Sequence, residues 1–254
     1  MIDTHAHIYL KEFKEDIHQV IDRALEKGVT KILLPNIDRT TIEDMLSLEE
    51  HYPDVCHAMM GLHPCSVKED FEHQLYEVES WLSKRKFIAL GEMGTDLYWD
   101  KTTWDIQKEA FKIQCDLAKR HELPLVIHCR ESIDETITLL KNDESHSLTG
   151  VFHCFTGTPE QGKTITEELK FYLGLGGVTT FKNSGLDLVV PHLNRDKLVL
   201  ETDSPYLSPV PERGKRNEPY KVKFVADKLA TLLNLSVEEV ASFTSDNANR
   251  LFFE

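Results

Sequence analysis

Short apolar runs alternate with longer segments of helical periodicity along almost the whole chain. Between the runs, apolar residues recur at i, i+3, i+4 and i+7, as in the segments 17–25 and, less regularly, 110–118. This alternation predicts parallel βαβ units. The predicted strands are Ile2–His5, Lys31–Pro35, Cys56–Leu62, Phe87–Gly91, Pro124–His128, Val151–Phe155, Phe171–Gly177 and Leu198–Glu201.

Local signals and the number of units define the predicted fold. Gly28 is expected to end the first helix, and Pro124 is expected to open the fifth strand. About eight units in about 250 residues predict the α/β class and a (β/α)8 TIM barrel, with a single domain over residues 1–254. The main alternative is a doubly wound open sheet, which commonly carries a glycine-rich phosphate loop. Neither GxGxxG nor GxxxxGK[ST] follows the first predicted strand, so the barrel is favoured.

Composition narrows the class of protein. Charged residues make up 28% and hydrophobic residues 41% of the chain, as in ordinary globular proteins. No stretch approaches the ~20 apolar residues of a spanning helix, and the N-terminus does not read as a signal peptide. The five cysteines form no CxxC pair, which suits a reducing compartment. We therefore expect a cytoplasmic protein that has no membrane partner and does not require oligomerisation.

The net charge limits the partners. The formal charge is 29 − 43 = −14, and a surface this acidic disfavours broad non-specific binding to duplex nucleic acid. A substrate that enters a local cationic pocket is still possible, especially where metal ions supply positive charge.

Polar side chains gather at the ends of the predicted strands, where a parallel barrel carries its chemistry. Strand alternation places His5 and His7 on one side, although an HxH pair is weak evidence in a chain with 12 histidines. Six strand ends carry such residues: His5, His7, His63, Glu92, Asp96, His128, His153, Glu201 and Asp203. Each has a structural alternative as a core, turn or capping residue. Together they predict a metal site, because a shared cation removes the cost of burying unpaired charges.

The motifs at these strand ends resemble those of the TatD-type metal-dependent deoxyribonucleases of the amidohydrolase superfamily. The resemblance covers nearly the whole chain and rests on residues 3–7, 61–64, 91–96, 125–130, 150–155 and 201–219. Two residues depart from the pattern: Tyr9 stands where Asp is common, and Thr95 stands where an apolar residue is usual. Neither is expected to touch a ligand position, although Thr95 could affect how Glu92 and Asp96 are held.

The resemblance implies a TIM-type barrel with two divalent metal ions, in some members a third, and hydrolysis of DNA phosphodiester bonds from the 3′ end. Its metal positions correspond to His5, His7, Glu92, His128, His153 and Asp203, with Glu92 as the bridging ligand.

The residue types also suggest roles in catalysis. Imidazole and carboxylate ligands suit Mg²⁺, Mn²⁺, Zn²⁺ or Fe, and Cys129 and Cys154 are expected to point away from the ions. Two ions about 3.5–4 Å apart could activate a water and stabilise the phosphoryl group. With Glu92 bridging the ions, Asp203 is expected to orient or deprotonate that water. His63 is expected to contact the phosphate or to protonate the leaving oxygen.

Two segments are candidates for substrate contacts. Arg213, Lys215 and Arg216 belong to the one notable cationic patch and could clamp backbone phosphates, or they could form a solvated loop diluted by Glu212 and Glu218. The loop after Glu92 carries Tyr98 and Trp99, which could stack on a terminal base or simply close the rim of the barrel.

The favoured hypothesis is a deoxyribonuclease, a hydrolase of ester bonds that shortens single-stranded or frayed DNA from the 3′ end. The alternative is an amidohydrolase or esterase that uses the same metal site on an acyl or other small substrate. A non-catalytic binding module is a third hypothesis, which the filled ligand positions disfavour. The choice between DNA and RNA, the metal identity and the pathway are left open.

Overall fold

Eight parallel strands surround the centre of the molecule in the computed structural model, which describes residues 1–142 and 147–254. Within these residues the strands are β1 (Ile2–Asp3), β2 (Lys31–Pro35), β3 (Cys56–Met59), β4 (Leu90–Asp96), β5 (Leu125–Arg130), β6 (Gly150–Phe152), β7 (Tyr172–Leu175) and β8 (Leu198–Leu200). They pair in chain order within two sheets, β1–β3 and β4–β8. Parallel bridges between Met60 and Leu90 and between Ala6 and Ser204 join the sheets into a closed ring. The predicted (β/α)8 barrel is confirmed.

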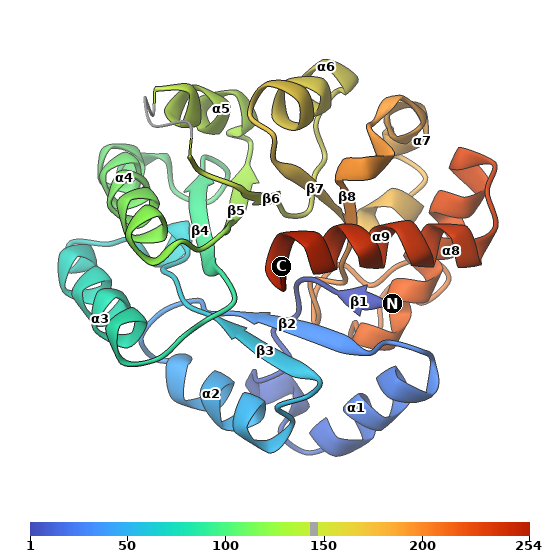
Figure 1. Cartoon of the computed structure of the whole chain (residues 1–254), viewed down its shortest axis with the longest axis horizontal. Helices are drawn as coiled ribbons and strands as arrows, with labels where there is room; N and C mark the ends of the chain where they lie inside the picture. The colour runs from blue at the N-terminus through green and yellow to red at the C-terminus, as the bar shows by residue number, and fades with distance from the viewer. Residues whose placement is uncertain (143–146) are drawn as a thin grey trace.

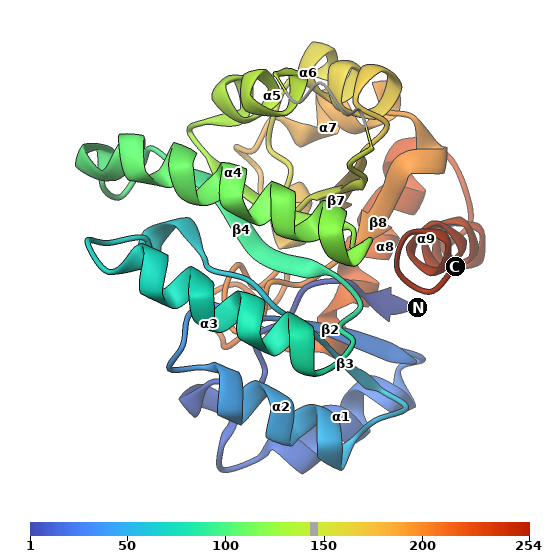
Figure 2. The same ribbon diagram turned by 60° about the vertical axis from the view of Figure 1, so that its left-hand side comes forward.

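Helices cover the outside of this ring (Figures 1 and 2). Those of the described chain are α1 (Ile17–Glu26), α2 (Ile42–His51), α3 (Phe71–Lys84), α4 (Trp104–His121), α5 (Ile133–Lys141), α6 (Pro159–Lys163), α7 (Leu186–Val189), α8 (Val222–Leu233) and α9 (Val237–Phe252). Helix α1 buries Val20, Ile21 and Ala24, the stripe that the periodicity predicted. Gly28 follows it with φ +79°, a left-handed conformation that favours glycine, and so ends the helix as expected. Within the described residues, no helix is both long and apolar enough to span a bilayer.

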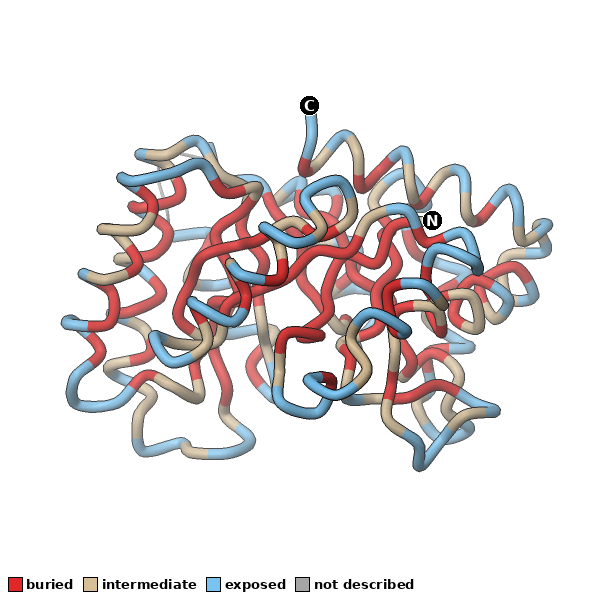
Figure 3. The backbone as a smooth tube through the Cα atoms, turned by 90° about the horizontal axis from the view of Figure 1, so that it is seen from below, coloured by how far each residue is buried: buried red, intermediate tan, exposed pale blue. Residues whose placement is uncertain are grey.

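The interior of the barrel is built in layers, and its base is apolar. Helix α9 crosses this end, and Ala248 and Phe252 of α9 pack against the layer. The Asn247 side-chain amide donates to the Leu198 carbonyl at 2.9 Å and thereby anchors α9 to β8. In Figure 3, which draws the backbone as a tube, the buried segments lie in the centre of the molecule and the exposed turns lie at its periphery. The barrel contributes Ile2, Leu33, Met59, Ala89, Val126, Val151, Tyr172 and Val199 to this layer.

Two residues further along each strand the interior becomes polar or small. Strand alternation returns the chain to the same face, so Val126 is followed by His128, and Val151 by His153. Val199 is followed in the same way by Glu201. The apolar layer therefore seals one end of the barrel, and the next layer carries the imidazoles and carboxylates.

The predicted bounds of the fourth strand, Phe87–Gly91, are wrong. Strand β4 begins at Leu90 and continues through Glu92 to Asp96, with an irregular register against β5 between Leu90 and Met93. Glycines permit this course: a Cβ on Gly91 would lie 2.6 Å from the Val126 Cβ, and one on Gly94 would lie 1.9 Å from the His128 carbonyl oxygen. Glu92 consequently projects from within a strand rather than from its end.

Candidate metal centre

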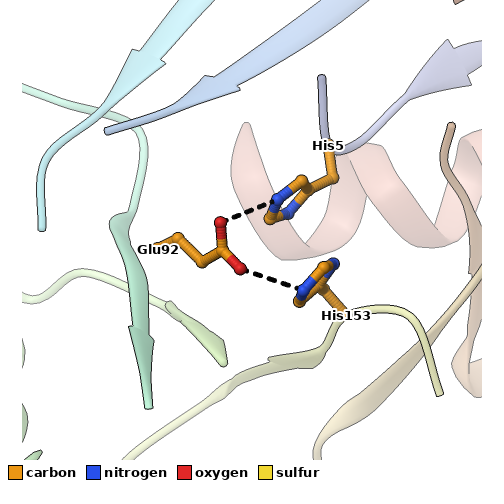
Figure 4. A group of neighbouring side chains, drawn as sticks. All are labelled: His5, Glu92 and His153. Carbon is orange, nitrogen blue, oxygen red and sulfur yellow. Dashed lines mark hydrogen bonds and ion pairs between the residues drawn. The ribbon is translucent and has the colours of Figure 1, made fainter. Parts of the chain in front are cut away.

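The six predicted ligands converge above the apolar layer, and Glu92 lies at their centre. One carboxylate oxygen, Oε2, lies 3.2 Å from His5 Nε2 and 3.3 Å from His7 Nε2. The other, Oε1, lies 2.9 Å from His128 Nδ1 and 3.0 Å from His153 Nε2. Figure 4 shows the carboxylate reaching His5 on one side and His153 on the other. One carboxylate thus faces two sets of imidazoles, the arrangement expected of a ligand that bridges two cations.

Asp203 completes the side of the centre formed by His5 and His7. Its Oδ1 lies 3.5 Å from His7 Nε2 and 3.8 Å from His5 Nε2. The Asp203 backbone has φ +57°, a left-handed conformation that is uncommon for a residue other than glycine. Its N–H donates to the His5 carbonyl at 2.8 Å, so the chain after β8 is held beside the chain after β1. Local backbone strain of this kind is concentrated at functional sites.

Several imidazole nitrogens of the centre face one another instead of facing a hydrogen-bond donor. His5 Nε2 faces His7 Nε2 at 3.2 Å, and His128 Nδ1 faces His153 Nε2 at 3.3 Å. Each pair requires a proton or a cation between its nitrogens. The buried Nδ1 atoms of His5 and His153 have no hydrogen-bond partner among the described residues. Although burial opposes ionisation, the imidazoles around Glu92, His63 foremost, hold the pKa of its carboxyl well below the usual value.

These donors fit a divalent metal ion. Ligand atoms within 4.8 Å of one another form three overlapping groups among the described residues: His5, Glu92 and His153; His5, His7 and Asp203; and His63, Glu92 and His128. None of these groups contains a thiol, as the sequence led us to expect. Imidazole and carboxylate donors suit Mn²⁺, Fe or Zn²⁺, and a carboxylate-centred site also accepts Mg²⁺.

Tyr9 contacts a predicted ligand, contrary to the expectation from the sequence. Its hydroxyl lies 2.9 Å from His7 Nδ1 and donates to the Pro35 carbonyl at 2.5 Å. The hydroxyl proton is therefore committed to Pro35, and the phenol oxygen accepts from His7 Nδ1–H. This hydrogen bond leaves the lone pair of His7 on Nε2, the atom that faces Glu92 and Asp203. Tyr9 therefore orients His7 through a neutral hydroxyl, at a position where the family commonly has the carboxylate of Asp.

Replacing Tyr9 with Phe is expected to weaken metal binding about ten- to hundredfold, because His7 loses the partner that fixes its tautomer. Isothermal titration calorimetry with Mn²⁺ measures this directly on the purified protein. Tyr76→Phe is the matched control, since the Tyr76 side chain is 70% exposed. An unchanged dissociation constant in the Tyr9 variant would show that His7 is oriented by other contacts.

Thr95, the second departure, is buried away from the ligands. Its hydroxyl lies 2.8 Å from Ser132 Oγ and 2.7 Å from Thr136 Oγ1. These two hydroxyls satisfy a polar side chain that would otherwise be costly at a buried position. Thr95 therefore ties β4 to the start of α5.

Asp96 supports His128 and was not assigned a role from the sequence. Its Oδ2 lies 2.9 Å from His128 Nε2, which leaves His128 Nδ1 to face Glu92. Its Oδ1 accepts from the backbone N–H groups of Tyr98 and Trp99, each at 2.9 Å. Burial alone would raise the pKa of Asp96, but the bond to His128 and these N–H groups lower it to about 2. The sequence signal that could have indicated this role is the position of Asp96, two residues after Gly94 and at the end of a strand.

Glu201 lies beside His153 as a charged neighbour rather than as a hydrogen-bond partner. Its Oε1 lies 3.4 Å from His153 Nδ1 and accepts from the Cys154 backbone N–H at 2.6 Å. Room for its carboxylate comes from Gly174, where a Cβ would lie 2.3 Å from Glu201 Oε2. The sequence left open the alternative that Glu201 caps a helix after Pro205. No helix begins directly after Pro205, so this alternative is wrong.

His63 lies on the open side of the centre. Its Nδ1 accepts from the Cys65 backbone N–H at 3.0 Å, and its Nε2 lies 3.3 Å from Glu92 Oε1. Because Nδ1 accepts, the neutral ring carries its proton on Nε2. Burial lowers the pKa of His63 below its usual value.

A cavity of about 620 Å³ opens above these residues. This volume falls within the range of about 300–1,000 Å³ that is common for small-ligand sites. The lining residues are His7, Ile37, His63, Cys65, Ser66, Glu92, Trp99, His128, Arg130, His153, Asp203, Tyr206 and Leu207.

The cationic loop favoured by the sequence does not line this cavity, so substrate binding by Arg213, Lys215 and Arg216 stays a prediction. Arg216 is held by Asp16 at 2.7 Å and by Glu218 at 2.9 Å. Lys215 pairs with Glu212 at 2.8 Å, and the Arg213 guanidinium stacks on Phe181 at 3.9 Å. Glu212 and Glu218 lie within the loop, as the alternative of a solvated loop expected, whereas Asp16 and Phe181 come from distant parts of the chain that sequence spacing does not reveal.

Comparisons with known proteins identify the family of this chain. A family model described as TatD related DNase matches residues 2–253. The chain is 41% identical to YabD, an uncharacterized metal-dependent hydrolase of Bacillus subtilis, over 99% of this chain and 98% of that protein. It is 31% identical to the 3′-5′ ssDNA/RNA exonuclease TatD of Edwardsiella piscicida, over 99% of each. The crystal structure of YJJV, a TatD homologue from Escherichia coli K12, superposes with a TM-score of 0.92 at 30% identity, covering 99% of this chain and 97% of that one. The chain therefore belongs to the TatD related DNase family and is a metal-dependent hydrolase.

Proposed function

We propose that this chain is an exonuclease that hydrolyses phosphodiester bonds at the 3′ end of single-stranded DNA. The observation that carries the proposal is Glu92, whose two oxygens each face two or more imidazoles at the floor of the cavity. Paired divalent ions are common in enzymes that hydrolyse phosphodiesters. The Edwardsiella piscicida relative is named as an exonuclease of single-stranded DNA and RNA, so RNA is a second substrate to be tested.

In this proposal His5, His7, Glu92, His128, His153 and Asp203 hold two divalent ions. When bound, the ions supply Lewis acidity to the phosphoryl oxygens and lower the pKa of a coordinated water. The residues of the chain orient the reactants: Glu92 holds the two halves of the centre together, and Asp203 orients the attacking water and accepts its proton. The Asp203 side chain lines the cavity and is 15% exposed, so a water in the cavity can reach it.

His63 is proposed to donate a hydrogen bond from Nε2–H to the leaving oxygen, which stabilises the negative charge that develops there. Its Nδ1 accepts from the Cys65 backbone, so the proton of the neutral ring lies on Nε2 at the cavity surface. A ring in this tautomer is a donor at Nε2 and not a metal ligand there. This tautomer favours a role as hydrogen-bond donor over membership of the third ligand group.

Replacing His63 with Ala is expected to lower kcat on an oligonucleotide by about 10²–10³-fold, the usual cost of removing one donor to a developing oxyanion. The loss is expected to be much smaller on bis(p-nitrophenyl) phosphate, because p-nitrophenolate delocalises its charge and leaves without a hydrogen-bond donor. His73→Ala is the control, since the His73 side chain is 65% exposed. Equal losses on both substrates would assign His63 to phosphate binding or to structure instead.

The proposed activity is tested with strands labelled at either end. With Mg²⁺ or Mn²⁺, a 5′-labelled single-stranded DNA is expected to give a ladder that shortens from the 3′ end, while a 3′-labelled strand releases its label at once. RNA of the same sequence and a blunt duplex are run in parallel. Cleavage that begins at the 5′ end or internally would overturn the proposed polarity. Hydrolysis of acyl esters without cleavage of any strand would favour the amidohydrolase or esterase alternative.

A further inference from the structure

The loop between β4 and α4 presents two large aromatic side chains at the mouth of the cavity. Tyr98 is 47% exposed and Trp99 is 67% exposed, and Trp99 lines the cavity. The loop is held at its start, because Asp96 Oδ1 accepts from the backbone N–H groups of both residues. Exposed aromatic surface beside a catalytic centre is typical of a binding surface.

Arg130 lies against these aromatics. It ends β5, two residues after His128 and in register with Asp96 on β4. Its guanidinium carbon lies 3.8 Å from the centroid of the Tyr98 ring and 5.3 Å from that of Trp99. Stacking on the rings orients the planar guanidinium and leaves its N–H donors at the ring edges.

Arg130 has no acidic partner among the described residues; Arg213 likewise stacks on an aromatic ring without an ion pair, but only Arg130 of the two lines the cavity. Within residues 1–142 and 147–254, no carboxylate forms an ion pair with it, whereas Arg216 and Lys215 are both paired. Asp96, its neighbour in register, uses Oδ1 for the loop and Oδ2 for His128. Among the described residues that line the cavity, Arg130 is the one arginine or lysine.

A cation with free donors and an exposed indole on one wall of the cavity match two adjacent parts of a nucleic-acid strand. The guanidinium suits a phosphodiester, and the indole face suits a base. The protein carries a net charge of −14 and therefore repels a polyanion at long range. A positive side chain in the cavity, such as Arg130, attracts the phosphate locally.

We propose that Arg130, Tyr98 and Trp99 form a subsite for the nucleotide on the 5′ side of the scissile bond. Arg130 binds the phosphate next to the scissile one, Trp99 stacks on the neighbouring base, and Tyr98 holds the guanidinium in place. The subsite rests on the proposed nuclease function, and it replaces the cationic loop of residues 213–216 as the phosphate-binding element.

The test varies the phosphate and the arginine together. Three substrates are compared: the dinucleotide TpT, the trinucleotide TpTpT, and TpTpT in which the 5′-side phosphate is a neutral methylphosphonate. All three share the same 3′-terminal scissile bond. Arg130→Ala is expected to raise KM for TpTpT about tenfold, as for loss of a charge-assisted hydrogen bond, and to leave kcat unchanged. The same variant is expected to change KM for TpT and for the methylphosphonate less than twofold.

Two variants serve as controls. Lys101→Ala removes the same charge from an exposed residue near this loop that does not line the cavity, and it is expected to leave all three KM values unchanged. Arg130→Lys keeps the charge but loses the stacked planar fork, so it should recover only part of the affinity. A similar KM increase for all three substrates, or none for TpTpT, would overturn the subsite.

A second readout separates failure of the subsite from failure of the nuclease function. If the wild-type enzyme hydrolyses none of these substrates, the proposed function fails. Binding is then measured on the metal-loaded protein by tryptophan emission, with Trp99→Phe identifying the signal of Trp99 among the three tryptophans. Tighter binding of TpTpT than of its methylphosphonate, with the difference lost in Arg130→Ala, would support the subsite. Equal binding of the two would overturn it.

Discussion

Replacing Glu92 with Gln is expected to abolish hydrolysis, with a loss of at least about a thousandfold, and to lower the metal content of the purified protein. Glu92 faces the imidazoles of both halves of the centre, and its oxygens lie 2.9–3.3 Å from their nitrogens. Glutamine keeps the shape but not the charge, and its NH₂ group cannot bind a cation. A loss of several kcal/mol of electrostatic stabilisation corresponds to about three orders of magnitude in rate.

The measurements are kcat on an oligonucleotide and metal content by elemental analysis. Glu109→Gln, an exposed substitution on α4, is the matched control and should keep both values at the wild-type level. Far-ultraviolet circular dichroism checks that the Glu92 variant is folded. A folded variant with wild-type activity and metal content would contradict the assignment of Glu92 as the shared ligand.

Removal of metal with a chelator is expected to abolish activity and to lower the melting temperature by about 5–10 °C. A ligand at about 100 times its dissociation constant stabilises the folded state by about 2.7 kcal/mol, and each kcal/mol shifts the melting temperature of a domain this size by about 2–4 °C. The physical reason lies in the facing nitrogens at 3.2 Å and 3.3 Å, which a cation would bridge. Activity and melting temperature should both return when Mn²⁺ or Mg²⁺ is restored.

Differential scanning calorimetry follows the shift, and chelator already saturated with metal controls for its other effects. The Glu92→Gln variant should show a smaller metal-dependent shift than the wild type, because its centre lacks the shared carboxylate. Full activity after exhaustive chelation, with no metal found by elemental analysis, would contradict a catalytic metal centre.

The ligand cluster was predictable because strand periodicity is a strong local signal. His128 and His153 each follow a buried valine by two residues, so they share its inward face once the strands close into a barrel. Position at a strand end then brings residues far apart in the chain to one mouth. Glu92 was placed correctly in the cluster although the bounds of its strand were wrong, because Gly91 and Gly94 let β4 continue along β5.

The supporting residues were harder to predict. Tyr9 contacts His7 from the same loop, Asp96 contacts His128 from the neighbouring strand, and Glu201 reaches His153 across the intervening β7. No local pattern distinguishes such a residue from an ordinary buried polar one. The partner of a histidine nitrogen depends on the relative rotation of two strands, which is a property of the closed barrel.

The phosphate-binding element that we propose differs from the one that local reasoning favoured. Charge density along the chain favoured residues 213–216, but ion pairing in the fold commits Arg216 to Asp16, which is 200 positions away. Arg130 belongs to the motif of residues 125–130, but the sequence assigned it no role in binding. Only the tertiary structure shows that it has no ion pair among the described residues and lies beside Trp99.

By itself, the sequence determined the barrel through short-range periodicity repeated along the chain, and it gave the candidate ligands through their strand-end positions together with the family resemblance. The tertiary structure decided which nitrogen of each histidine faces the centre, which residues contact the rings, and which cation at the cavity has no ion pair among the described residues. The physical reason is that hydrogen bonds and ion pairs form between groups that are distant in the chain. Whether a charge is available for substrate depends on what the fold has placed beside it.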